Sequence, residues 1–299
     1  MKIDLHPQLN KNPAITLPGV RPLGTLFVFL FVSSFPAFAF PLQETTTPRT
    51  FADWCLNKNK ESVQIQHTVD VLLQVAKTTD CHQAGKLLST RSELYLNNNQ
   101  ITDLKPLSSL TNLAFLNLGN NQIADLKPLS TLTNLTGLTL YNNQIADLKP
   151  LSTLTNLTSL SLYNNQIASL RPLSTLTNLT ILLLENNQIA DLKPLSTLTN
   201  LTRLLLNNNQ ITDLKPLSTL TKLTGLLLAK NQIADLKPLS TLTNLTTLDL
   251  NNNQITGLQP LSTLTNLKRL DIYNNQTLTD KTCPVKPASV CRFAPFQAG

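Results

Sequence analysis

The stretch LAFLNLGNNQIADLKPLSTLTN, residues 113–134, decides the fold, because the chain repeats it in register. An earlier copy starts at Arg91, and later copies start at Leu135, Leu157, Leu179, Leu201, Leu223, Leu245 and Leu267. The chain therefore holds eight full units of 22 residues and a ninth, truncated unit. A fixed period in the twenties with regularly spaced leucines indicates a solenoid, in which each unit buries its apolar side against its neighbours.

Each unit divides into a strand and a return segment. We number the places of each unit from its first residue, so that Leu113 is place 1 of the second unit. Leucines at places 4 and 6 alternate with polar residues, which predicts a short strand with one buried face. Proline at place 16 excludes a regular helix from the second half but leaves room for a short 3-10 turn. Because strands pack more closely than the return segments are wide, we expect a parallel sheet on the concave side. In the second unit, the residues predicted to point inward are Leu113, Leu116, Leu118, Ile123, Leu126, Leu129 and Leu132.

An asparagine occupies place 9 of every unit. The nine residues of this ladder are Asn99, Asn121, Asn143, Asn165, Asn187, Asn209, Asn231, Asn253 and Asn275. The turn after the strand leaves buried backbone groups that need partners. We interpret the asparagines as structural, each bridging its own turn and that of the next coil, rather than as ligand contacts. The Asp at place 13 and the Lys at place 15, as in Asp125 and Lys127, are interpreted as a solvated convex face.

The pattern Leu-x-x-Leu-x-Leu-x-x-Asn-x-Ile with this period resembles the leucine-rich repeats of bacterial secreted and surface proteins, the internalin-like group. The phrase Asn-Gln-Ile-x-Asp-Leu-Lys-Pro-Leu-Ser-x-Leu-Thr-Asn is especially close. The resemblance covers residues 91 to about 280. It implies an α/β leucine-rich repeat fold: a right-handed solenoid with a curved parallel β-sheet on the concave face and 3-10 turns on the convex face. It also implies recognition of another macromolecule on the concave face.

The beginning of the chain has the pattern of an export signal. Lys2, Lys11 and Arg21 precede the apolar run 26–32, and Ala37-Phe-Ala39 follows it. A basic flank, a short apolar stretch and Ala-x-Ala are typical of a secretory signal peptide, here residues 1–39. An uncleaved membrane anchor and a mis-assigned start codon are the alternatives. The apolar run is shorter than the roughly 20 residues of a membrane span, so we expect no stable span after cleavage.

The solenoid needs a cap at each end, because open ends expose leucines. Residues 40–50 are predicted to be a flexible lead-in, and residues 51–90 a helical N-terminal cap with helices near 61–77 and 82–88. Residues 91–280 form the repeats, and residues 281–299 a disulfide-stapled C-terminal cap and tail. His67, on the first of these helices, is interpreted as a surface residue rather than a catalytic one.

Four cysteines flank the repeats, two before and two after. Strands lie about 4.8 Å apart, so eight steps separate the two ends by about 40 Å. A disulfide needs Cα atoms within about 7 Å, which leaves only the pairs Cys55–Cys81 and Cys283–Cys291. A zinc site is the rival interpretation, although the chain has no Cys-x-x-Cys. Disulfides agree with export and favour a secreted, periplasmic or cell-envelope location.

Residues that vary between units while facing outward are the candidates for function. On the strands these are places 3, 5 and 7, which include all four tyrosines of the chain. A cluster of varied residues in the middle is predicted to be exposed and to bind a partner: Tyr141, Tyr163, Ile181, Leu183, Glu185, Arg203, Leu205 and Leu227. Exposed apolar patches often mark partner sites, and Tyr and Arg are frequent hot-spot residues. Drift among recently duplicated units is the alternative explanation, since Leu and Tyr are good strand formers.

Three functions follow from these features. The first is a non-enzymatic binding protein that captures a protein or peptide on its concave face. The second is a structural envelope component or a binder of cell-wall glycan. The third and most remote is an enzyme, because no serine–histidine–acid set or carboxylate pair can be assembled from the repeats. No catalytic residue, metal site or cofactor is predicted. The net charge of +7 is spread along the chain, so nucleic acid is not expected as a partner.

Overall fold

The computed structural model describes residues 49–294. The signal peptide predicted for residues 1–39 and most of the lead-in, residues 40–48, lie outside this part of the chain, as do residues 295–299. None of the helices within residues 49–294 is long and apolar enough to cross a membrane.

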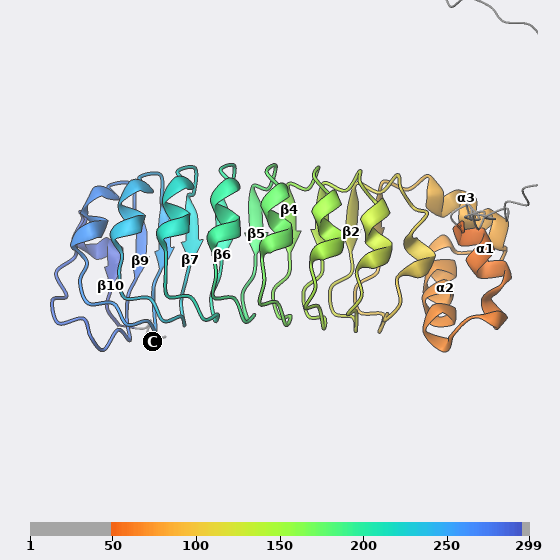
Figure 1. Ribbon diagram of the computed structural model, residues 1–299, viewed down its shortest axis with the longest axis horizontal. Coiled ribbons are helices and arrows are strands. Elements are labelled where there is room, and N and C mark those ends of the chain that lie inside the picture. The colour runs from red at the N-terminus through yellow and green to blue at the C-terminus, as the bar shows by residue number, and fades with distance from the viewer. Residues whose placement is uncertain (1–48, 295–299) are drawn as a thin grey trace, which may run out of the picture. The chain divides into compact units, whose positions relative to one another are not determined.

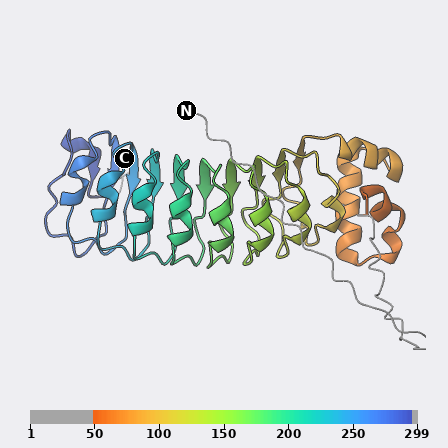
Figure 2. The same ribbon diagram turned by 45° about the horizontal axis from the view of Figure 1, so that its top comes forward.

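The described residues form an open, curved sheet of ten parallel strands in sequence order. The strands lie on one side of the solenoid and the 3-10 turns on the other (Figures 1 and 2). The strand bounds are β1 Glu93–Tyr95, β2 Phe115–Asn117, β3 Gly137–Thr139, β4 Ser159–Ser161, β5 Ile181–Leu183, β6 Arg203–Leu205, β7 Gly225–Leu227, β8 Thr247–Asp249, β9 Arg269–Asp271 and β10 Cys291–Arg292. From β1 to β9, each residue pairs with the residue 22 positions later, so equivalent places form straight columns across the sheet.

The convex side consists of short 3-10 helices, as the proline at place 16 predicts. Their bounds are Lys105–Leu107, Lys127–Thr131, Lys149–Thr153, Arg171–Thr175, Lys193–Thr197, Lys215–Thr219, Lys237–Thr241 and Gln259–Thr263. The proline lies in the first turn of each of these helices, where its missing N–H costs nothing. Inside the coils, the leucines and isoleucines of the seven apolar places form one continuous core, as predicted.

The asparagine ladder joins successive coils. The Asn143 amide nitrogen donates to the carbonyls of Leu118 in the preceding coil and Leu140 in its own, each at 3.0 Å. Its oxygen accepts from the backbone N–H of Ile123 at 2.9 Å. The amide thus reaches the preceding coil, and our expectation of the next coil was wrong. The backbone N–H and carbonyl of the residue at place 6, such as Leu118, both point toward the following coil. The N–H donates to the Thr139 carbonyl there, but the carbonyl has no backbone partner in that coil. The following asparagine supplies the donor that this carbonyl lacks.

The aspartate at place 13 has a structural role that we did not predict. Asp125 Oδ1 accepts from the backbone N–H of Lys127 at 2.9 Å and so forms an Asx turn that leads into the 3-10 helix. The same contact recurs in the other units that have aspartate at this place; Ser169 stands in for it at 3.5 Å before Arg171. The aspartate therefore stabilises this turn and is also part of a solvated surface.

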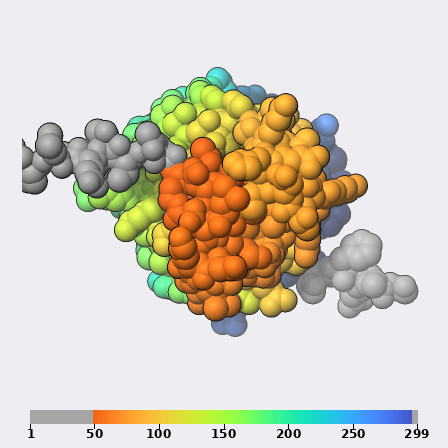
Figure 3. Space-filling model, turned by 90° about the vertical axis from the view of Figure 1, so that its right-hand side faces the viewer, coloured from red at the N-terminus to blue at the C-terminus, as the bar shows by residue number. Residues whose placement is uncertain are grey.

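Three helices cover the first coil: α1 Phe51–Leu56, α2 Val63–Ala76 and α3 Cys81–Ser89. In Figure 3 these helices form the N-terminal end face of the solenoid. The predicted helices match α2 and α3, whereas α1 was not predicted. The Cys55–Cys81 disulfide links α1 to α3, with Cα atoms 5.5 Å apart.

Thr68 Oγ1 donates to the Asp103 carbonyl at 2.7 Å, and the His67 ring lies 2.6 Å from the Asn99 carbonyl. Helix α2 thus supplies partners to the first coil, which has no coil before it.

The other end is closed by the segment after β9. The Cys283–Cys291 disulfide forms a small loop, and β10 then pairs with β9 in parallel. Val285 and Val290 are buried beneath this loop. All four cysteines are therefore in the two predicted disulfides, and none is left to bind zinc.

Candidate binding face

The concave face is made of the columns at places 3, 5 and 7, whose side chains point away from the core. The sheet register brings the predicted cluster together on β3 to β7 and the residues just after these strands. Leu183, Leu205 and Leu227 occupy place 5 of three successive coils and form one stripe, while Tyr141, Tyr163 and Glu185 follow one another at place 7.

Two tyrosines dominate the place 7 column. The rings of Tyr141 and Tyr163 stack with centroids 4.7 Å apart and planes 2° apart. Gly119 precedes them in the same column, and a Cβ atom added there would lie only 2.4 Å from Cε1 of Tyr141. The glycine therefore makes room for the first ring. Burial raises the pKa of the Tyr163 hydroxyl, and the neighbouring Tyr141 and Glu185 raise it further.

A second pair of aromatic rings lies on the first two strands, outside the predicted cluster. The ring centroids of Tyr95 and Phe115 are 5.4 Å apart. Phe115 leans over Gly137 on β3, where an added Cβ atom would lie 2.7 Å from Cδ2 of the ring. Tyr95 is 57% exposed, and Phe115 is half-buried. The sequence signal that indicates such a ring is an aromatic residue one unit before a glycine at the same place, here Phe115 before Gly137.

The aliphatic residues of the cluster are less exposed than predicted. Ile181, Leu183, Leu205 and Leu227 are all half-buried, and only Arg203 is exposed. They were expected to be exposed, but side chains on strands about 4.8 Å apart cover one another's flanks. What remains accessible is a continuous apolar strip rather than four separate side chains.

Glu185 lies at the end of the tyrosine column. Burial raises the pKa of its carboxyl, and backbone hydrogen bonds from Glu185 and Leu184 offset part of this rise. Its Oε2 atom has no hydrogen-bond partner. None of the ion pairs formed within residues 49–294 includes it. Ser161, on β4, is also buried, and its hydroxyl likewise has no partner. The middle of the concave face therefore contains two polar atoms that the described residues do not satisfy.

The C-terminal part of the face is charged, which we did not predict. Asp271 is almost completely buried, and its carboxylate pairs with Arg269 and, at 3.8 Å, with Arg292. Burial raises the pKa of the adjacent Asp249. Leu227 pairs in register with Asp249, so the apolar strip ends where this charged group begins.

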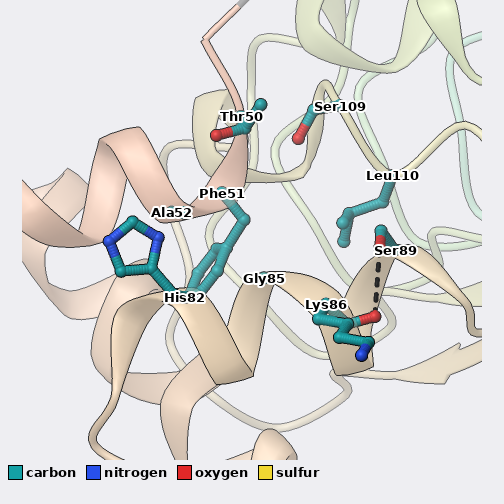
Figure 4. Close-up of a pocket in the computed structure, with 9 residues that line it drawn as sticks. All are labelled: Thr50, Phe51, Ala52, His82, Gly85, Lys86, Ser89, Ser109 and Leu110. Atoms are coloured by element: carbon teal, nitrogen blue, oxygen red, sulfur yellow. Dashed lines mark hydrogen bonds between the residues drawn. The ribbon is translucent and has the colours of Figure 1, made fainter.

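A cavity of about 270 Å³ lies between the N-terminal cap and the residues just after the 3-10 helix Lys105–Leu107 (Figure 4). Its lining includes His82, Lys86 and Ser89 on α3. Ser89 donates its hydroxyl to the Lys86 carbonyl at 3.0 Å. His82 is seven residues before Ser89, about 10 Å along the helix, and Figure 4 shows Phe51 between them. These two residues therefore do not form a nucleophile–base pair. Within residues 49–294, no three His, Cys, Asp or Glu side chains gather as a metal site would require.

Comparison with known proteins agrees with this architecture. The family model described as leucine-rich repeats (2 copies) matches residues 92–131, 133–176, 177–219, 199–241, 221–262 and 243–282. A search of the curated proteins gives no match.

Several solved structures of similar proteins are of bacterial proteins. Internalin C2 of Listeria monocytogenes is 35% identical, with a TM-score of 0.64, and the match covers 68% of this chain and 91% of that one. The internalin inlF of the same species is 30% identical, with a TM-score of 0.65, over 84% of this chain and 78% of that one. A leucine-rich repeat protein of Leptospira interrogans is 31% identical, with a TM-score of 0.62, over 71% and 56%.

The fold is thus that of a leucine-rich repeat solenoid with a helical cap. The chain belongs to the leucine-rich repeat family and, within it, to the internalin-like bacterial group. One structure of the same fold, the ectodomain of a plant receptor kinase from Arabidopsis thaliana, was solved in complex with CASPARIAN STRIP INTEGRITY FACTOR 2. It is 25% identical, with a TM-score of 0.59, over 64% of this chain and 25% of that one.

Proposed function

We propose that this protein is a non-enzymatic, exported binding protein that captures a protein or peptide on its concave face. The observation that carries the proposal is the accessible strip formed by the stacked tyrosines and the leucines of β5, β6 and β7. The framework places repeat almost without change, whereas places 3, 5 and 7 vary. Variation concentrated on one face of a repeating scaffold is expected where that face contacts a partner.

The composition of the strip supports a protein partner. Tyrosine supplies a large contact area with few rotatable bonds, and a central apolar patch with a polar rim is the usual anatomy of an interface. Here Arg203 lies beside the strip, and the charged group around Asp271 borders its C-terminal end. The plant receptor ectodomain was solved with a bound partner, so a scaffold of this fold can bind another molecule. At 25% identity, this similarity does not identify the partner of this chain.

Export is the second part of the proposal. Two disulfides in the described residues favour an oxidising compartment outside the cytoplasm. The secretory signal predicted for residues 1–39 points the same way, and a secreted, periplasmic or envelope location follows. Fusion of residues 1–50 to a reporter that is active only outside the cytoplasm would test this part. An inactive reporter, with the fusion protein retained inside the cell, would reject it.

Selection from a phage-displayed library of random 12-residue peptides tests the binding proposal. The wild-type chain is compared with the double variant Tyr163→Ala, Leu205→Glu, which removes one stacked ring and places a charge in the strip. A control double variant of the convex face, Lys193→Ala with Lys215→Glu, introduces the same two residue types at exposed positions and changes the net charge by more. We expect the wild type and the convex variant to enrich peptides and the concave variant to lose them. Enrichment that survives the concave changes contradicts the site.

A glycan-binding or purely structural envelope role is the alternative. The asparagines at place 8 form an exposed amide ladder beside the tyrosines, with Asn208 donating to Asn186 at 2.7 Å. Because these amides are largely satisfied by one another, they offer sugar hydroxyls fewer free groups than their number implies. Binding to a cell-wall polysaccharide array, without enrichment of any peptide, would favour this alternative.

A further inference from the structure

Two buried polar atoms in the middle of the concave face lack any hydrogen-bond partner. They are the hydroxyl oxygen of Ser161 and Oε2 of Glu185. The other unpartnered buried side-chain atoms within residues 49–294 are Trp54 Nε1 in the cap and Asp271 Oδ1 at the C-terminal end. Leaving a buried polar atom unpaired is unfavourable, so each such atom requires an explanation. A carboxylate oxygen that can only accept, close to a hydroxyl that can both donate and accept, indicates a ligand that supplies the missing partners.

The sheet register places these atoms close together. Ser161 on β4 pairs with Leu183 on β5, and Glu185 lies two residues beyond Leu183 on the same face. Such diagonal neighbours on a sheet have Cα atoms roughly 7–8 Å apart. A donor group that settles between the two side chains is therefore within reach of both. Tyr163, two residues beyond Ser161, completes a square of four side chains around that position.

The ring of Tyr163 favours a positively charged donor. One face of the ring is covered by Tyr141, which precedes it in the column, so the opposite face lies on the side of Glu185. The face of an aromatic ring attracts cations. A half-buried carboxylate without a counter-ion is best compensated by a charge, because a neutral donor offsets less of its desolvation. A single carboxylate offers too few oxygen ligands for Ca²⁺, which takes six to eight.

We propose that this square is a subsite for a basic side chain, Arg or Lys, of the partner protein or peptide. The cationic group lies over the free face of Tyr163, pairs with Glu185 and donates a hydrogen bond to Ser161. Its hydrocarbon stem lies along Leu183, and apolar neighbours in the partner extend over Leu205. The subsite rests on the proposed function, because a basic side chain is recognised here only if the concave face binds a protein or peptide.

The same peptide selection, applied to different variants, tests the subsite. The wild-type chain is compared with Glu185→Gln, which keeps the shape and removes the charge. Glu93→Gln on β1 is the matched control, since it removes the same charge from the same face far from the strip. We expect the wild type and the control to enrich peptides with Arg or Lys at one fixed position. The Glu185→Gln variant is expected to select apolar peptides without this preference.

A synthetic peptide then provides the quantitative test. For a peptide selected by the wild type, replacing its Arg by citrulline or its Lys by norleucine should weaken binding about tenfold or more, and much less for Glu185→Gln. Equal losses in both proteins, or wild-type selection without a basic residue, overturn the subsite and leave the proposed function standing. Failure of the wild type to select any peptide removes the proposed function, and the subsite with it.

Discussion

Tyr141 stacks against Tyr163 only because Gly119, one coil earlier in the same column, has no side chain. The ring of Tyr141 occupies the space that a Cβ atom on Gly119 would fill. The stacked pair in turn fixes which face of Tyr163 is turned toward Glu185. Three successive coils therefore determine the shape of the candidate binding face.

The Gly119→Ala variant tests this dependence. The added methyl group would lie 2.4 Å from Cε1 of Tyr141, so the ring must turn away and the stack must open. Because a ring can move where backbone cannot, we expect a loss of stability of no more than about 1 kcal/mol. The upfield ring-current shifts of the two tyrosines should disappear from the NMR spectrum. Gly257→Ala, where nothing lies within 4 Å, is the matched control. Unchanged shifts in Gly119→Ala would show that the ring does not depend on the glycine.

The core is tested by Leu182→Ala. Leu182 is completely buried between adjacent coils, and truncating it should lower the free energy of unfolding by about 2–5 kcal/mol. Leu183, the next residue, points to the concave face and is half-buried, so Leu183→Ala should cost clearly less. Urea denaturation followed by circular dichroism measures both. Equal costs for the two variants would contradict the assignment of faces on this strand.

The asparagine ladder is tested by Asn187→Ala. The amide of Asn187 donates to the carbonyls of Leu162 and Leu184, each at 3.1 Å, and accepts from the N–H of Ile167 at 3.0 Å. Without it, these backbone groups lose their partner, at a cost of about 1–3 kcal/mol. Gln188→Ala, one residue later and exposed, should change stability by less than about 0.5 kcal/mol. Urea denaturation again provides the measurement, and a negligible effect of Asn187→Ala would remove the ladder's structural role.

The pKa of Glu185 predicts a pH dependence of stability. Burial raises this pKa above its ordinary value of 4.5, so the folded protein holds the proton more tightly than the unfolded chain. The free energy of unfolding therefore falls as pH rises from 4.5 through the raised pKa. Above the raised pKa, the full cost of burying the ionised carboxylate is present. Glu185→Gln removes this cost. Scanning calorimetry should give the variant a higher melting temperature than the wild type at pH 7, with the difference shrinking toward pH 4. A difference that does not change with pH would show that the burial of this carboxylate is not responsible.

The repeat predicted the framework because equivalent residues have equivalent surroundings. The period fixed the register of the strands, Pro128 and its equivalents fixed the 3-10 helices, and the distance between the ends fixed both disulfides. The direction of the asparagine bridge was not predictable from the period. It depends on which way the carbonyl of Leu118 points at the end of its strand.

The binding face was predictable only in part. Variation at places 3, 5 and 7 identified the column of Tyr141 and Tyr163, but the lean of each ring depends on its rotamer and on a glycine in a neighbouring coil. Phe115 was missed for this reason, since Gly137 makes room for it. The partial burial of Glu185 was likewise not predictable, because it depends on residues of neighbouring coils, which no pattern within a single unit contains.

The most direct test of concave-face binding is to measure the protection of tyrosines from oxidative labelling by mass spectrometry. All four tyrosines of the chain lie on this face, from Tyr95 on β1 to Tyr273 after β9. With a saturating selected peptide, we predict that labelling of Tyr141 and Tyr163 falls sharply while labelling of Tyr273 does not change. A bound peptide that leaves Tyr141 and Tyr163 as reactive as in the free protein would contradict the account.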